Sequence, residues 1–129
     1  MTAGTASDPL LVDSSGWLEY LTQDVNALAF APYLEGTRPL LVPTIVLYEV
    51  KKKILQIGSK VEADRFVSQA CQQQVIPLDE HLALAASEVS IAHRLAMADA
   101  IIYAIALAFQ AELVTSDNSF GGLPGVTVL

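Results

Sequence analysis

The sequence predicts an α/β domain built around a parallel β-sheet. Short apolar segments alternate along the 129-residue chain with longer segments whose apolar residues have helical spacing. Short, continuously apolar strands that alternate with helices are typical of βαβ units, whose sheets are buried on both faces. The length fits one domain, and a hydrophobic fraction of 53% excludes a largely disordered protein.

The first half of the chain is expected to contain two strands and four helices. In order, we expect a loose tail (1–8), a strand (9–13), two helices (14–21 and 24–34), a strand (40–42) and two helices (43–57 and 59–73). Ser14 or Ser15 would cap the first helix, because serine side chains accept hydrogen bonds from free helical N–H groups. Pro43 and Thr44 suit the first positions of a helix, and Gly36 and Gly58 suit helix ends.

The second half is expected to contain three strands and two helices. The expected elements are a strand (75–78), an alanine-rich helix (79–94), a second helix (97–110) and two strands (112–115 and 126–129). No repeat or linker interrupts this pattern, so residues 9–129 are predicted to form one domain after the tail of residues 1–8.

The charge is uneven. The formal net charge of −7 argues against a protein that coats nucleic acid in general. Residues 38–65, however, hold six of the seven basic residues and three acidic ones, which leaves −10 for the rest of the chain. This basic segment is compatible with a local anionic partner.

Cysteine content, apolar stretches and histidine positions limit where the protein is expected to act and which metal it is expected to bind. Cys71 is the only cysteine, which excludes an intramolecular disulfide framework. The longest apolar stretch, residues 95–109, contains Asp99 and is shorter than the roughly 20 residues of a membrane span. The N-terminus has no basic start or apolar core of an export signal, so we expect a cytoplasmic protein without a membrane segment. His81 and His93 have no nearby cysteine, which makes zinc a poor expectation.

Two aspartates follow predicted strands. Asp13 ends the apolar run Leu10-Leu11-Val12, and Asp117 follows the strand at 112–115. Sites in open parallel sheets form beyond the carboxyl ends of the strands, so both carboxylates would enter one cleft if these strands are neighbours. The alternative for each is an ordinary helix cap or turn residue.

Two further acids lie in helical segments. Asp99 is surrounded by apolar residues in MADAIIYAIA, where an unpaired carboxylate is costly, although a place in the first helical turn would lower that cost. Glu49 lies at the edge of an apolar helix face, and its alternative role is an i, i+4 ion pair with Lys53.

The four acids together indicate a cation site. Two carboxylates about 4 Å apart repel by roughly 4 kcal/mol at an effective dielectric constant near 20. A cluster of four needs protons or cations, and Mg²⁺ or Mn²⁺ are the ions that prefer oxygen ligands. Such ions support hydrolysis of phosphodiesters.

The order and context of these acids resemble the PIN-domain family, and above all the VapC-type toxin ribonucleases of toxin–antitoxin pairs. The resemblance covers residues 9–129 and rests on four segments: LLVDSSGWLEYL, VPTIVLYEVKKKIL, MADAIIYAIA and ELVTSDNSFGGLPGVTVL. It implies a three-layer α/β/α fold with a central, mainly parallel, five-stranded sheet.

The resemblance also implies an endoribonuclease that uses Mg²⁺ or Mn²⁺ and cuts RNA through a metal-activated water. By motif, its catalytic and metal-binding residues are Asp13, Glu49, Asp99 and Asp117. Toxins of this kind are typically kept inactive by a cognate antitoxin protein, and they often form homodimers. The sequence departs from the family at Ser116 and Asn118, where an arginine and a further acid are frequent.

Supporting roles are expected for residues around these acids. Ser15, Thr115 and Asn118 would orient carboxylates or substrate, and Lys52 and Lys53 would contact the RNA backbone unless they are simply solvated. A catalytically silent PIN-fold module that acts through a protein partner is the alternative function. A signalling receiver domain fits poorly, because the chain lacks paired acids after the first strand.

Overall fold

A sheet of five parallel strands, in the order β3-β2-β1-β4-β5, forms the centre of the molecule. The computed structural model describes residues 8–129. The strands are β1 (Leu10–Val12), β2 (Leu40–Pro43), β3 (Gln74–Ile76), β4 (Glu112–Thr115) and β5 (Val126–Val128). All four pairings between neighbours are parallel, which confirms the sheet predicted from the sequence.

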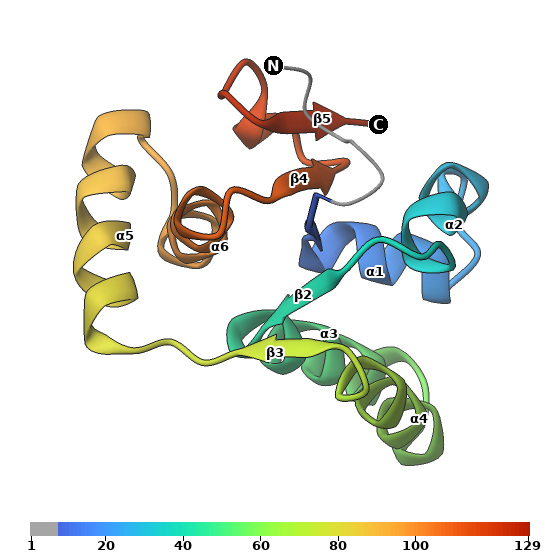
Figure 1. The fold of residues 1–129 in the computed structure, drawn as a ribbon. Coiled ribbons are helices and arrows are strands. Elements are labelled where there is room, and N and C mark those ends of the chain that lie inside the picture. Colours follow the sequence, from blue (N-terminus) through green and yellow to red (C-terminus); the bar gives the residue numbers. More distant parts are fainter. Residues whose placement is uncertain (1–7) are drawn as a thin grey trace.

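Helices cover both faces of this sheet. They are α1 (Ser14–Leu21), α2 (Ala27–Leu34), α3 (Thr44–Ile57), α4 (Lys60–Ala70), α5 (Glu80–His93) and α6 (Met97–Ala108). Figure 1 shows α1, α2 and α4 on one side of the strands and α5 and α6 on the other. Helix α3 packs on α1 and α4. The predicted three-layer α/β/α arrangement is therefore confirmed.

The direction of the chain across the sheet reverses next to β1. The chain passes from β1 to β2 and β3 on one side, and then returns to β4, which lies on the other side of β1. Such a reversal leaves a crevice beyond the carboxyl ends of the two strands, because their outgoing segments lead to opposite faces of the sheet. The pair β1–β4 therefore marks the place where a site is expected.

Most element boundaries differ by a few residues from the predicted ones. The cap of α1 is Asp13, whose side chain accepts a hydrogen bond from the N–H of Gly16, and not Ser14 or Ser15 as predicted. The second helix begins at Ala27 instead of residue 24. The helix predicted to reach residue 73 ends at Ala70, and β3 begins at Gln74.

A short 3₁₀ helix, η1 (Asn118–Phe120), was not predicted. It lies between β4 and β5 and buries Phe120. The alanine-rich region forms two helices, as predicted, because Arg94 has a left-handed backbone conformation that ends α5 (φ 55°).

The core depends strongly on α6, which buries every residue from Ala100 to Ala106. Tyr103 is the largest of these side chains, and its hydroxyl donates a hydrogen bond to the carbonyl of Pro124. Within residues 8–129 no single helix is long and apolar enough to cross a membrane. Helices α5 and α6 reach that length only as a pair, and the pair is bent by 111°.

The opposite end of the sheet is held by a partly buried ion pair. Arg38 Nη1 lies 2.9 Å from Glu112 Oε1, and Arg38 Nε donates to the carbonyl of Asp8. Thr127 donates to the other Glu112 oxygen, so β4 and β5 are linked to the segment that leads into β2. The predicted tail, residues 1–8, falls outside the described residues except for Asp8, and its flexibility remains a prediction.

We expect Gly16→Ala to destabilise the fold by about 1–2 kcal/mol, because overpacking a core costs roughly 1–3 kcal/mol and the gain in helix propensity is about 1 kcal/mol at most. A Cβ at Gly16 would lie 2.6 Å from side-chain carbons of both Phe30 and Val12, which are fully buried. Urea unfolding of the variant and the wild type measures the difference. Equal midpoints would show that the helix can move away from the sheet without cost.

Candidate active site

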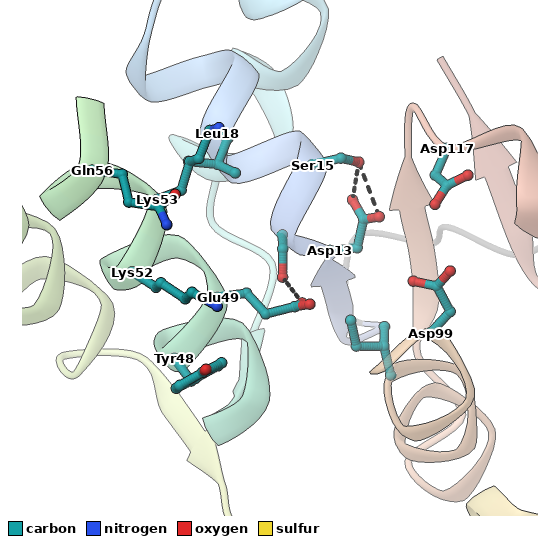
Figure 2. Close-up of a pocket in the computed structure, with 12 residues that line it drawn as sticks. Asp13, Ser15, Leu18, Tyr48, Glu49, Lys52, Lys53, Gln56, Asp99 and Asp117 are labelled. Carbon is teal, nitrogen blue, oxygen red and sulfur yellow. Dashed lines mark hydrogen bonds between the residues drawn. The ribbon is translucent and has the colours of Figure 1, made fainter. Parts of the chain in front are cut away.

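A pocket of about 380 Å³ lies at the carboxyl ends of β1 and β4 and collects all four acids that the sequence singled out. Its lining residues are Asp13, Ser14, Ser15, Leu18, Tyr48, Glu49, Lys52, Lys53, Gln56, Asp99, Ile102 and Asp117. In Figure 2, Asp13, Asp99 and Asp117 face one another on one side, and Glu49 extends toward them from α3 on the other. The expectation that Asp13 and Asp117 enter one cleft is confirmed.

Asp13 is the most buried of the acids, with 3% of its surface exposed. Its carboxylate accepts hydrogen bonds from Gly16 N (3.0 Å), Ser15 Oγ (2.9 and 3.0 Å) and Thr115 Oγ1 (2.7 Å). Burial raises the pKa of Asp13, these hydrogen bonds oppose that rise, and the charge of Asp117 adds to it. Asp13 is thus both a helix cap and a pocket residue, so the two interpretations offered for it are compatible.

Thr115 links the two strand-end aspartates. It is fully buried at the end of β4, donates to Asp13, and accepts a hydrogen bond from the backbone N–H of Asp117 at 2.8 Å. Asp117 in turn accepts from the N–H of Ser119, so it caps η1 while it lines the pocket. Asn118 is exposed and is not among the lining residues.

Asp99 enters the pocket from the first turn of α6 and is only partly buried. Its pKa is raised to about 6, first by burial and then by the negative charges of Asp117, Asp13 and Glu49. The convergence of acids that was inferred from the sequence is therefore visible as an electrostatic cost at Asp99.

Glu49 is held by a hydroxyl from α1. Ser14 Oγ donates to Glu49 Oε1 at 2.6 Å, a contact between residues that are 35 positions apart. The ion pairs within residues 8–129 are Arg38–Glu112 and Lys60–Asp64, so Glu49 is not paired with Lys53. The alternative role of Glu49, an i, i+4 ion pair with Lys53, is therefore wrong.

Helix α3 also carries the pocket's basic residues. Lys52 and Lys53 line the pocket with Glu49, whereas Lys51 is exposed elsewhere on the helix. Three successive residues of a helix cannot all face one cleft, since each residue turns by 100°.

Several lining residues were not predicted from the sequence. Ser14 was expected only as a possible cap, and Tyr48 and Gln56 were not among the expected site residues. Helical spacing was the available signal: Gln56 lies seven residues after Glu49, and Lys52 and Lys53 lie three and four residues after it. The contact of Ser14 with Glu49 had no local signal, because it depends on how α1 and α3 pack.

The donor set is made of carboxylate and hydroxyl oxygens, the chemistry preferred by Mg²⁺ and Mn²⁺. In residues 8–129, however, no three His, Cys, Asp or Glu side chains are arranged as a ready set of ligands. Asp13, Glu49 and Asp117 are instead engaged by N–H and hydroxyl donors. The residues fit a hard divalent cation by chemistry, and the raised pKa of Asp99 reflects its burial and the repulsion among the carboxylates.

Comparison with known proteins identifies the family. The sequence model of the PIN domain matches residues 10–125. The chain belongs to the PIN domain family. This span includes all four acids of the pocket, and it agrees with the resemblance stated from the sequence motifs. No curated protein matches the sequence significantly.

Solved structures share the fold of this PIN domain. A toxin–antitoxin complex from Klebsiella pneumoniae has a TM-score of 0.78 at 21% identity, over 92% of this chain and 96% of that one. VapBC2 from Rickettsia felis, bound to a DNA fragment from its promoter, has 0.70 at 15%, over 94% and 97%. VapC20 from Mycobacterium tuberculosis, a toxin that cleaves the sarcin–ricin loop, has 0.71 at 17%, over 89% and 95%.

We expect Asp99→Asn to stabilise the metal-free protein at pH 7.5, with the gain lost near pH 4. The folded-state pKa of Asp99 is about 6 and its ordinary value is 3.8, so the folded protein binds more protons between these values. Stability from this group therefore falls as the pH rises through that window. Thermal unfolding in chelator at both pH values measures the effect.

The control is Glu88→Gln, which removes one negative charge from an exposed position on α5. It separates relief of general acidic repulsion from relief inside the pocket. A wild type that is as stable as Asp99→Asn at pH 7.5 would contradict the repulsion described for the site.

Proposed function

We propose that this PIN domain is an endoribonuclease that depends on Mg²⁺ or Mn²⁺ and serves as the toxin of a toxin–antitoxin pair. One observation carries the proposal: four carboxylates from four different elements converge in one pocket at the strand reversal, and α3 adds lysines to the same pocket. Like charges held close together are unfavourable for folding, and such clusters with shifted pKa values occur mainly at functional sites.

The side chains have distinct roles in this proposal. Asp13, Glu49, Asp99 and Asp117 hold the cation, directly or through water, with Asp13 fixed by Ser15 and Thr115. A bound Mg²⁺ or Mn²⁺ supplies positive charge that neutralises the phosphate and makes water a better nucleophile. Ser14 keeps the Glu49 carboxylate directed into the pocket. Lys52 and Lys53 attract the RNA backbone.

A catalytically silent PIN module that acts through a partner protein is the second candidate. It is favoured by the finding that no three acids within residues 8–129 form a ready set of metal ligands. The hydrogen bonds that engage Asp13, Glu49 and Asp117 would then have only structural roles. Both candidates agree with the fold, and an experiment with purified protein separates them.

We expect purified protein to cut total cellular RNA into discrete fragments with Mg²⁺ or Mn²⁺, and excess chelator to abolish cutting. Asp13→Asn and Asp99→Asn should each lower the rate at least about 100-fold, since each removes a group that binds the essential cation. Asp99→Asn is the sharper variant, because it is also expected to be more stable than the wild type.

Glu88→Gln serves again as the control and should cut like the wild type. Identical weak smears from all variants would indicate a contaminating nuclease. A folded wild type that cuts no RNA and binds no Mn²⁺ by calorimetry would reject the nuclease and leave the silent module.

We also propose that the protein acts in the cytoplasm, binds a cognate antitoxin protein and forms a homodimer. The antitoxin is supported by the fold shared with toxin–antitoxin complexes. Exposed apolar residues on α5 and α6, namely Leu84, Ile91 and Met97, offer surface for a second copy. Light scattering after size-exclusion chromatography should give about twice the mass of 13.8 kDa. A monomer at all concentrations would contradict the dimer.

A further inference from the structure

One wall of the pocket consists entirely of residues from α3. They follow helical spacing along one face and are Tyr48, Glu49, Lys52, Lys53 and Gln56. Figure 2 shows them opposite the side of the pocket that carries Asp13, Asp99 and Asp117. Only Glu49 of this wall belongs to the acid cluster. The other four residues need a separate explanation.

Tyr48 is unusual for its exposure at this position. The residue is 59% exposed although it lines the pocket, and within residues 8–129 no hydrogen bond is found for its hydroxyl. The ammonium of Lys52 lies over the ring, 5.6 Å from its centroid. An exposed apolar residue alone has no special meaning, but an aromatic ring beside cations is the combination that binds single-stranded nucleic acids.

The two lysines of the wall are not neutralised by neighbouring acids. The ion pairs of the described residues involve Arg38 and Lys60, and neither Lys52 nor Lys53 takes part in one. Both side chains are exposed. Within the described part of the chain, Lys52 contacts the Tyr48 ring but no acid, and Lys53 is in no ion pair, so both positive charges are available to phosphate groups beside the acid cluster, where the scissile phosphate would lie.

We propose that this wall is a nucleotide subsite in which Tyr48 stacks on a base and Lys52 and Lys53 bind the adjoining phosphates. The subsite rests on the proposed function, because the acid cluster places the scissile phosphate next to it. A base that stacks on a side chain has left its own helical stack. The RNA is thus unpaired on the α3 side of the cleavage site.

Binding of a labelled ten-nucleotide oligoadenylate, measured by fluorescence anisotropy, tests the subsite. An Asp99→Asn background with Mg²⁺ keeps the RNA intact. We expect Tyr48→Leu to weaken binding about ten-fold, as loss of one base–aromatic stack does, and Tyr48→Phe to change it less than about two-fold. Lys53→Ala should lower the slope of log affinity against log salt by about one, whereas Tyr48→Leu should leave the slope unchanged.

Leu55→Ala is the matched control, because Leu55 is exposed on the same helix but does not line the pocket. A second probe, the same oligomer with abasic nucleotides throughout, separates stacking from indirect effects. The abasic oligomer should bind the background protein more weakly than oligoadenylate does. The substitution Tyr48→Leu should not weaken binding of the abasic oligomer any further.

Three results would overturn the subsite. The first is that the background protein does not measurably bind oligoadenylate. The second is that Tyr48→Leu binds oligoadenylate as tightly as the background protein does. The third is that Tyr48→Leu loses as much affinity for the abasic oligomer as for the intact one. Failure of the nuclease itself is distinct. In that case the wild type cuts no RNA, while the dependence of oligomer binding on Tyr48 persists.

Discussion

The parallel pairing of β1 with β4 is the constraint on which the site depends. Its register joins Leu11 to Leu113 and Val12 to Val114, and the N–H of Asp13 donates to the carbonyl of Val114. Because the strands run in the same direction, the residues that follow them emerge at one edge of the sheet. Thr115 then links the carboxylate of Asp13 to the backbone of Asp117 within that edge.

The acid cluster lowers stability, and the surrounding structure offsets part of that loss. N–H and hydroxyl donors surround Asp13, and Ser14 holds Glu49. Asp99 has the weakest compensation, and its pKa is accordingly raised to about 6. A domain that needed these acids only as helix caps would gain nothing from bringing all four together. This mutual repulsion is what the proposed divalent cation would relieve.

The pocket combines acidic and basic side chains because all three layers of the fold contribute to it. The strand ends and α6 contribute carboxylates, whereas α3 contributes lysines, an aromatic ring and Glu49. The basic segment that stood out in an acidic chain is thereby divided. Arg38 and Lys60 pair with acids away from the pocket, and Lys52 and Lys53 remain at the site. The pocket therefore has acids from the strand ends and α6 on one side and lysines from α3 on the other.

The sequence by itself determined the α/β class and five strands in nearly their correct places, because apolar periodicity and strand length are local properties. It also determined the four acids, because each stands out beside an apolar segment. Only the tertiary structure decided which side chains complete the site. Ser14 meets Glu49 across 35 residues, and Thr115 meets Asp13 across 102. Neither contact leaves a local pattern, since each depends on how helices and strands pack. The cap of α1 was predicted wrongly because serine and aspartate are comparable caps in sequence. The tertiary structure decides for Asp13, which the end of β1 holds in the capping position.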